Sequence, residues 1–315
     1  MSKATRQAFG EALAKLGEKH EDIVVLDADL AKSTKSELFA KKYPNRFFEM
    51  GIAEANMIGT AAGLAFGGKL PFLCSFGAFI TGRYDTIRLS VAYSGANVRI
   101  IGTHAGVGIG DDGHSQMGLE DISLMRALPT MGVFQPMDAR ETELLMDYLV
   151  TEHKGPAYVR LTRQNLPDLY PANAPFKPGK LIEILPASGG KAKVVCIASG
   201  ATVGESVEAA KLLAAQGISM SVWNAGTLKP FDDEKTLELA QGAELIVTAE
   251  DHSVIGGLGS CVAEAMSKKP QTARLVRLGI QDDFGESGEP VELYDKHGIS
   301  AKMIAREIAK QLGKM

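Results

Sequence analysis

One acidic side chain is unusual because its neighbours in the sequence are small or apolar. Glu54 lies in the stretch FFEMGIAEANM (47–57), and the run IGTAAGLAFGG follows it. A carboxyl group in such surroundings either points to water or lies in a dry place, where it is costly unless it is neutral or paired. The plainer explanations are an acid in the first turn of a helix, favoured by the helix dipole, or a solvent-facing side chain. Residue types alone leave open whether Glu54 does chemistry.

A glycine-rich stretch, GTHAGVGIGDDGHSQMGLED (102–121), has the highest density of polar groups. It contains six glycines, two histidines and four acids. Its spacing matches neither the dinucleotide pattern G-x-G-x-x-G nor a phosphate loop that ends in Gly-Lys-Ser/Thr. A metal site formed by Asp111, Asp112 and His114 lacks a supporting ligand spacing, so we expect no metal on this chain. Taken alone, the stretch is equally well explained as a flexible surface loop.

Four further side chains lie where apolar runs end. His104 ends one such run, where a histidine is more often structural. Arg163, in YVRLTRQN, could bind phosphate or carboxylate through two hydrogen bonds or could cap a carbonyl. Phe76 and Phe79, in SFGAF, are either core residues or an aromatic wall for a planar ligand. Each is ambiguous alone, so its meaning depends on the elements that position it.

Short apolar runs alternate with longer amphipathic ones, which predicts an α/β fold with mostly parallel sheets and helices on both faces. The expected strands are 23–28, 46–50, 70–76, 98–104, 132–136, 157–162, 193–199, 219–225, 244–251 and 273–279. The expected helices are 3–18, 54–66, 79–94, 119–127, 138–153, 202–217, 258–267 and 301–314. In such sheets ligands bind at the carboxyl ends of the strands, which is where Glu54 and the stretch 102–121 occur.

A change in composition and periodicity divides the sequence into two parts. The stretch PDLYPANAPFKPGKLIEILPASGGK (167–191) contains five prolines and no sustained periodicity, so we expect a linker there. The predicted organisation is two α/β domains, 1–168 and 192–315, joined by a linker at 169–191.

Composition excludes several classes of protein. Apolar residues make up 45% and charged residues 23%, which is typical of globular domains. The formal net charge of −4 argues against a nucleic-acid partner. No run approaches the ~18 consecutive apolar residues of a membrane span, and the N-terminus lacks the apolar core of a signal peptide. Three cysteines without a pairing pattern suit a reducing environment, so we expect a cytoplasmic protein without membrane contact: Cys74, Cys196 and Cys261.

The order of four motifs resembles the C-terminal half of the transketolase family. The motifs are GIAEANM, SFGAFITGRYDTIR, GTHAGVGIGDDGHSQMGLED and RLTRQN, and the later segments TLKPFD (227–232) and AEDHSVIGGLG (249–259) also fit. The resemblance runs from TRQAFGEAL (5–13) to the C-terminal helix, and IGDDGHSQMGLED is similar to the animal-type variant. It implies a pyrimidine-binding domain at 1–168 and a transketolase C-terminal-like domain at 192–315.

The resemblance implies thiamine diphosphate as the cofactor. Glu54 falls on the family's catalytic glutamate, which hydrogen-bonds N1′ of the aminopyrimidine ring and helps the ring's amino group act as a base. Phe76 and Phe79 match the aromatic residues that line this ring, although Gly82 replaces a usual tyrosine. Asp29 matches an acid near the cofactor and the subunit contact.

The resemblance also implies transfer of a two-carbon ketol unit from a ketose phosphate to an aldose phosphate, as in the pentose phosphate pathway of carbohydrate metabolism. A substrate histidine of the bacterial pattern falls on Gln116, as in the animal type, whereas His114 is offset. A sulfonate would suit the same cationic groups as a phosphate. The residues that match contacts to the sugar hydroxyls and the terminal phosphate are Arg6, Ser33, His104, Asp112 and Arg163.

The sequence lacks the part of a complete transketolase that binds the diphosphate. That part carries magnesium through a GDG motif followed by an asparagine. Here GDDG (110–113) is not GDG, and no asparagine occurs between Asn97 and Asn165. We therefore expect one subunit of a split transketolase, whose partner carries the GDG motif, Mg²⁺ and the diphosphate. The expected assembly is a homodimer core or a heterotetramer with two copies of each chain (α2β2).

Three other interpretations remain. The β subunit of a 2-oxo-acid dehydrogenase E1 has the same two-domain layout and the same glutamate, and a deoxyxylulose-phosphate synthase fragment is a second candidate. Asp112, Arg163 and the loop GIGDDGHSQM (108–117) favour transketolase over the first, and the same loop disfavours the second. A non-catalytic subunit that retains the fold is the third, and Glu54 argues against it. Phosphate and sulfonate sugars are both compatible with these residues.

Overall fold

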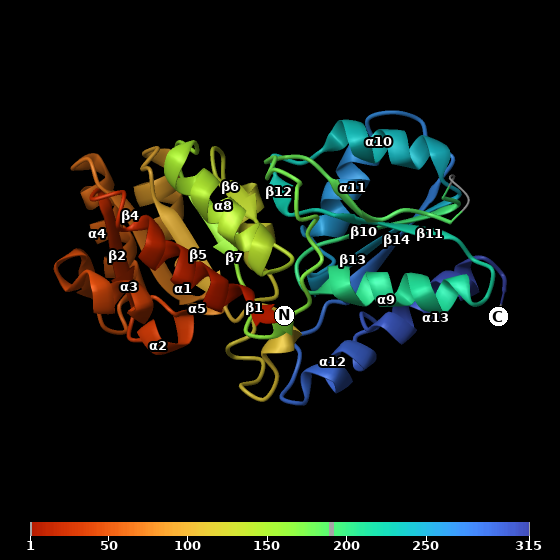
Figure 1. Cartoon of the computed structure of the whole chain (residues 1–315), viewed down its shortest axis with the longest axis horizontal. Coiled ribbons are helices and arrows are strands. Elements are labelled where there is room, and N and C mark those ends of the chain that lie inside the picture. The colour runs from red at the N-terminus through yellow and green to blue at the C-terminus, as the bar shows by residue number, and fades with distance from the viewer. Residues whose placement is uncertain (1, 189–191, 315) are drawn as a thin grey trace.

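The apolar runs of the first half form a seven-stranded sheet. The computed structural model describes residues 2–188 and 192–314. The strands of this sheet are β2 (Ile23–Asp27), β3 (Phe47–Glu49), β4 (Leu70–Phe76), β5 (Arg99–Thr103), β6 (Gly132–Phe134), β7 (Ala157–Arg160) and β12 (Thr227–Lys229). Their order is β12-β6-β7-β5-β4-β2-β3, and all neighbouring pairs are parallel except β12 with β6. In Figure 1 this half lies at the left.

Helices cover both faces of this sheet because successive strand residues point to opposite sides. Val25 and Phe72 pack on one face, against α1, α3 and α8, whereas Leu26 and Leu73 pack on the other, against α4, α5, α7 and the π-helical segment η2. These helices are α1 (Thr5–Leu16), α3 (Glu37–Lys42), α4 (Glu54–Phe66), α5 (Gly77–Thr81), η2 (Ile87–Tyr93), α7 (Asp121–Ala127) and α8 (Ala139–Thr151).

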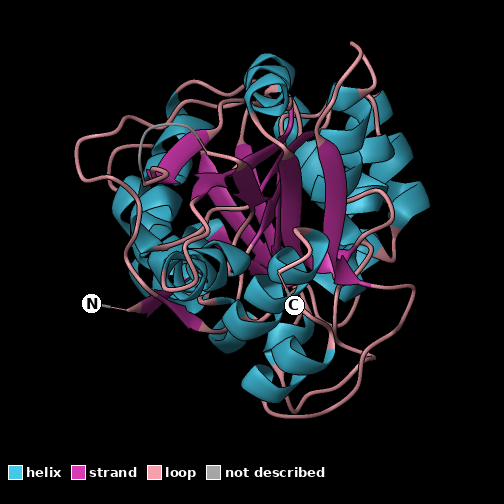
Figure 2. Cartoon of the chain, turned by 90° about the vertical axis from the view of Figure 1, so that its right-hand side faces the viewer, coloured by secondary structure: helices cyan, strands magenta, loops and turns pink. Residues whose placement is uncertain are grey.

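The second half repeats the arrangement around a five-stranded sheet. Its strands are β9 (Ile182–Leu185), β10 (Val194–Ala198), β11 (Met220–Asn224), β13 (Leu245–Ser253) and β14 (Arg274–Ile280). Their order is β14-β13-β10-β11-β9, with only β9 antiparallel to its neighbour. Helices surround the strands, as the end-on view of Figure 2 shows. They are α9 (Thr202–Ala214), α10 (Asp233–Gly242), α11 (Leu258–Met266), α12 (Pro290–Lys296) and α13 (Ala301–Gln311).

The two halves share a sheet and a core. Strand β12, which follows β11 in the chain, leaves the second half and pairs with β6 of the first sheet. One apolar cluster also runs without a break from Ile100 and Tyr158 to Ile197, Ile246 and Leu258. This continuity holds the halves in a defined arrangement.

The predicted two-domain, mostly parallel α/β fold is confirmed. The expected helix at 54–66 is α4. A single helix at 79–94 was wrong, because the chain breaks there into α5, α6 (Tyr84–Thr86) and η2. Strand β9 lies within the stretch expected to be a linker, and the boundaries at 168 and 192 stay predictions. Within the described residues, no helix is both long and apolar enough to cross a membrane.

A buried ion pair joins the halves next to the glycine-rich stretch. Arg160, the last residue of β7, donates from Nε to the Asp121 carboxylate at 2.9 Å, and both side chains are fully buried. Its Nη2 donates to the carbonyl oxygens of Gly118 at 2.8 Å and of Asp251 in β13 at 2.9 Å. A single guanidinium therefore connects β7, α7 and the second half.

Replacing Arg160 by leucine is expected to lower the free energy of unfolding by about 3–5 kcal/mol, because the Asp121 carboxylate is left buried without its counter-charge. Urea unfolding of the chain measures this. The control is Arg140→Ala, which removes an exposed pair with Glu143 at 4.0 Å and should change stability by less than about 1 kcal/mol. Equal effects of the two substitutions would contradict the structural role of Arg160.

Candidate active site

Glu54 both begins a helix and is buried. It is the first residue of α4, directly after the turn that follows β3, and only 5% of its surface is exposed. Within residues 2–188 and 192–314, its carboxyl group has no hydrogen bond or ion pair. Most of the Glu54 side chain is covered, but its carboxyl oxygens are not among the fully enclosed polar atoms of the described residues. The carboxyl of Glu54 is therefore available for a group from outside the chain.

Three rings stack at the carboxyl ends of β4 and β5. Phe76 ends β4, and its ring lies 5.4 Å from that of Phe79 in α5, with planes 16° apart. The ring of His104, just beyond β5, lies 3.9 Å from Phe76 at 24°. Phe76 thus stacks with both rings, and Phe76 and Phe79 together form an aromatic wall. Gly82, at the end of α5, offers no third side chain to this wall.

His104 is linked to two other predicted residues through Arg6. Nη1 of Arg6 lies 2.9 Å from Nε2 of His104 and donates to the carbonyl oxygen of Ser33 at 2.7 Å. Because arginine has only donors, Nε2 must accept. The proton is then on Nδ1, which lies 2.8 Å from the hydroxyl of Thr103. The structure therefore brings Arg6, Ser33 and His104 together from α1, α2 (Ala31–Thr34) and the end of β5.

Burial and nearby cations keep this histidine neutral. Burial, followed by the positive charge of Arg6, lowers the pKa of His104 to about 3. Arg163 and Lys35 add to this lowering. His104 also has a φ of 56°, a left-handed conformation that is uncommon outside glycine and that clusters at functional sites. The surroundings of His104 are thus strongly cationic.

The glycine-rich stretch holds the second predicted arginine. Nη1 of Arg163 donates to the carbonyl oxygen of Ile109 at 3.0 Å and lies 3.2 Å from Asp111 and 3.5 Å from Asp112. Burial is the main cause of the lowered pKa of Arg6. The positive charge of Arg163 lowers this pKa further, whereas the charge of Asp112 raises it. Arg6, Arg163 and Asp112 therefore belong to one electrostatic cluster.

Two predicted residues lie outside these contacts. Asp29 is exposed, has a φ of 61°, and its backbone N–H donates to Glu49 at 2.7 Å. Gln116 is half-buried and shows only a backbone hydrogen bond to Gly113 at 3.1 Å among the described residues. Neither is joined to the Phe76–His104 stack by a hydrogen bond or ring contact.

Sequence reasoning missed Lys35 and Asp27. Lys35 lies two residues after Ser33, directly after α2, and this proximity in the sequence could have indicated it. Asp27 ends β2 and is fully buried, and its carboxylate accepts hydrogen bonds of 2.7 Å from the backbone of Leu30 and the hydroxyls of Thr34 and Ser36. Burial raises the pKa of Asp27 to about 6. These bonds fold α2 so that the Ser33 carbonyl meets Arg6.

The geometry fits the pyrimidine ring of thiamine diphosphate. The Glu54 carboxyl has no partner among the described residues, and the stacked phenylalanines form an apolar wall of the kind that planar rings prefer. The residues described in the structure contain no group of histidine, cysteine or acidic side chains arranged for a metal ion.

Comparisons with known proteins agree over nearly the whole chain. Residues 1–168 match the family "Transketolase, pyrimidine binding domain" and residues 187–304 match "Transketolase, C-terminal domain". The putative transketolase C-terminal section of Methanocaldococcus jannaschii is 42% identical over 99% of this chain and 97% of that protein. The 6-deoxy-6-sulfo-D-fructose transketolase subunit SqwH of a Clostridium species is 41% identical over 96% of this chain and 92% of that protein.

A solved structure agrees as well. A split-gene transketolase, described as an inactive β4 tetramer, superposes with a TM-score of 0.87 and 41% identity over 98% of both chains. Other matching transketolases and transketolase-like proteins are longer, and this chain spans only 47–52% of their length.

The stability of the chain is expected to fall as the pH is lowered from 6.5 toward 3, in part through His104. The unfolded imidazole binds a proton near pH 6.5 and the folded one only near pH 3, so acid favours the unfolded state in this window. His104→Gln should reduce the slope of unfolding free energy against pH. His114→Gln, at an exposed histidine of the adjacent stretch, should leave it unchanged, and identical slopes for wild type and His104→Gln would contradict the prediction.

Proposed function

The chain belongs to the transketolase family, and from this premise we propose that it is the C-terminal subunit of a split transketolase. It transfers a two-carbon ketol unit from a ketose phosphate to an aldose phosphate, and a partner chain shares the active site. The observation that carries this proposal is Glu54, a buried residue whose carboxyl has no partner within the described residues. Two relatives that this chain covers almost completely are a C-terminal section and a subunit of transketolases, which supports the split.

The residues of this chain would act on the pyrimidine side of the cofactor. Thiamine diphosphate, when bound, supplies the electron sink for cleavage of the donor sugar. Glu54 would hold a proton at N1′ of the ring, and a ring that covers the carboxyl would shield that hydrogen bond from water. Phe76 and Phe79 would exclude water from one face of the ring, and the exposed Asp29 would contact the cofactor only across the subunit boundary.

The cationic cluster would bind the anionic tail of the sugar. Arg6 and Arg163 supply the charge, and the Ser33 hydroxyl and His104 supply hydrogen bonds. Asp112 and Gln116 would bind sugar hydroxyls. The relative named for a sulfo-fructose substrate makes a sulfonate tail a second candidate, because the same groups accept either anion. We assign the reaction to cytoplasmic carbohydrate metabolism, including the pentose phosphate pathway.

An exposed apolar face supports assembly with further chains. Ile52 is 82% exposed and Tyr93 is 88% exposed, and both lie in or beside α4 and η2. On the outer side of α4, a Cβ added at Gly59 or at Gly63 would meet no described atom within 4 Å. Exposed apolar surface of this kind marks interaction sites. We propose that two copies of this chain pair here and that each binds a partner chain with the GDG motif, Mg²⁺ and diphosphate site.

Glu54→Ala is expected to lower ketol transfer by the chain assembled with its partner on the order of 10²–10⁴-fold, because an acid–base contact is lost. Steady-state assays with a panel of ketose phosphates measure the loss, and calorimetry with and without the partner measures thiamine diphosphate binding. Glu208→Ala, at an exposed acid of α9, is the control and should keep full activity.

The chain alone is expected to be inactive. Measurable ketol transfer by the purified chain without a partner would rule out the split-subunit proposal. Intact activity of the Glu54→Ala complex would instead rule out the assignment of Glu54 while leaving the split untouched.

Gly59→Leu is expected to weaken self-association without unfolding the chain. The new side chain has room on the free surface of α4, and leucine is a better helix former than glycine. It would nevertheless keep two copies of α4 apart. Sedimentation measures the assembly state, and Gly242→Leu on α10, also open to solvent, is the control. An unchanged assembly in Gly59→Leu would place the contact elsewhere.

A further inference from the structure

A carboxylate of the second half holds the middle of the glycine-rich stretch. Oδ1 of Asp251, in β13, accepts a hydrogen bond from the backbone N–H of Val107 at 2.8 Å, and Oδ2 accepts one from Gly108 at 3.2 Å. The hydroxyl of Tyr294, in α12, donates to Oδ2 at 2.8 Å. Asp251 is only 2% exposed. Three donors from two parts of the chain therefore converge on one buried carboxylate.

The backbone of the stretch is shaped to receive this carboxylate. Gly106 has a φ of 91°, and a Cβ at this position would lie 2.2 Å from Oδ2 of Asp251. Any other residue would collide with the carboxylate and would be strained by the left-handed backbone. The glycine thus allows the short turn η3 (Val107–Ile109) to direct its first N–H groups at Asp251.

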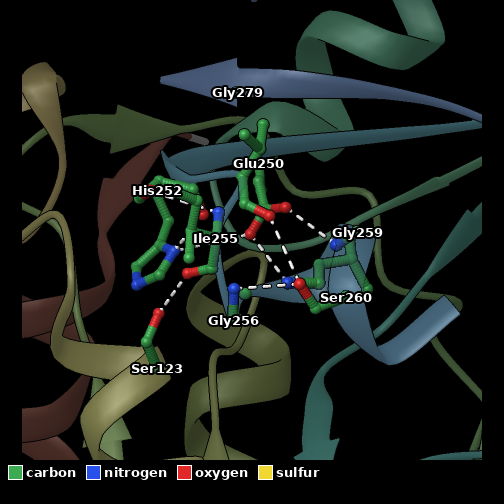
Figure 3. A network of polar contacts seen from close by, with 12 residues as sticks. Ser123, Glu250, His252, Ile255, Gly256, Gly259, Ser260 and Gly279 are labelled. Carbon is green, nitrogen blue, oxygen red and sulfur yellow. Dashed lines mark hydrogen bonds and ion pairs between the residues drawn. The ribbon is translucent and has the colours of Figure 1, made fainter. Parts of the chain in front are cut away.

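Asp251 is itself rigidly placed. Its carbonyl oxygen accepts the 2.9 Å hydrogen bond from the buried Arg160. The adjacent residue Glu250 accepts hydrogen bonds from the backbone of Leu258 at 2.7 Å and of Gly259 at 2.8 Å. Figure 3 shows the hydrogen bond from Gly259 to Glu250, which ties the end of β13 to the start of α11. Because these hydrogen bonds fix the backbone on both sides of it, the carboxylate of Asp251 has little freedom to move together with the glycine-rich stretch.

The residues held by Asp251 lie between two of the proposed substrate contacts. His104 precedes Val107 and Asp112 follows Gly108 in the same stretch. Between Ile109 and Asp112, the described side-chain hydrogen bonds come from Arg163, to the carbonyl oxygen of Ile109 and to the two exposed acids, and the Ile109 side chain packs in an apolar cluster with Leu293 and Tyr294. Asp251 is the buried polar anchor between His104 and Asp112.

We propose that Asp251 is a positioning residue, through which the C-terminal domain sets the geometry of the substrate-binding stretch 104–112 without touching the substrate. The inference rests on the proposed function, because it takes His104 and Asp112 as substrate contacts. It gives the second half a defined part in ketol transfer: it orients the groups that bind the sugar and its anionic tail.

The role requires a carboxylate and not merely a side chain of that shape. Both oxygens of a carboxylate accept, which suits two backbone N–H groups and one hydroxyl. In Asp251→Asn, one of the two positions becomes an N–H₂ donor that faces another donor. The substitution keeps the volume of the side chain and removes part of its accepting capacity, so it tests the anchor itself.

The test compares wild type and Asp251→Asn, each assembled with the partner chain. With a ketose phosphate donor, we expect KM to rise about tenfold or more, as for a lost buried hydrogen bond. With a short β-hydroxy-α-keto acid donor, which carries the ketol unit and releases carbon dioxide in place of a sugar phosphate, kcat should stay within about twofold of wild type, since Glu54 and the aromatic wall are untouched. Hydrogen exchange at the amides of 106–113 should become faster in the full chain.

Two further variants make the test specific. Asp138→Asn is the matched control, because Asp138 is also fully buried and accepts from the backbone of Glu141 and Leu169 at 2.8 Å and of Tyr170 at 2.7 Å. It anchors the chain after β8 (Asn165–Leu166), so it should lower stability without separating the two donors. Tyr294→Phe removes one donor to Asp251 and should give a smaller change than Asp251→Asn in the same direction.

The proposal is overturned if the amides of 106–113 exchange hydrogen in Asp251→Asn at the wild-type rate. It is also overturned if the substitution changes the kinetic constants of both donor substrates equally, which is the result expected for Asp138→Asn. Failure of the proposed function gives a different result. The wild-type assembly would then transfer no ketol unit from any donor, and hydrogen exchange in the chain alone would still decide whether Asp251 anchors the stretch.

Discussion

The buried guanidinium of Arg160 is the constraint around which the two halves are arranged. It lies at the end of β7 and donates to the Asp121 carboxylate and to the carbonyl oxygens of Gly118 and Asp251. Because arginine stays protonated in proteins, these acceptors must remain in place or a charge is left unpaired in an apolar core. The pair closes the glycine-rich stretch at one end and fixes β13 beside it. The bond from Arg160 to the Asp251 carbonyl oxygen, together with the shared core, places the Asp251 carboxylate beside the stretch.

The parallel sheet explains why the remaining polar groups meet. Adjacent β4 and β5 end on the same edge, so Phe76 and His104 come within stacking distance. Strand β2 ends on the same edge, where Asp27 folds α2 back and its Ser33 carbonyl meets Arg6. Side chains from the ends of several strands therefore meet at one edge of the sheet, as they generally do in open α/β sheets.

The sequence predicted the features whose signal is local. The boundaries of α4 follow from Glu54 in its first turn and the small and apolar residues after it, all within one segment. Strand β12 was not predicted, because it has only three residues and exists by pairing with β6, which lies far earlier in the chain. Asp251 was missed for the same reason: its hydrogen-bond partner Val107 is 144 residues away. The order of the motifs, through the resemblance, identified His104 and Arg6 as site residues. The contact between them, and the position of Lys35 near His104, became visible only in the folded structure.

Several features of the site are left unmatched in the isolated chain. The Glu54 carboxyl has no partner among the described residues, His104 has a left-handed backbone, and the charges of Arg6 and Arg163 repel. Under the proposed function, groups from outside match two of these: a ring nitrogen for Glu54 and an anion for the arginines. A ligand that binds only the folded state stabilises it in proportion to its affinity. Glu54 and the exposed Gly59 lie on the same helix, α4. Under the proposed function, the helix that carries the catalytic carboxyl is therefore also the helix at which two copies of the chain pair.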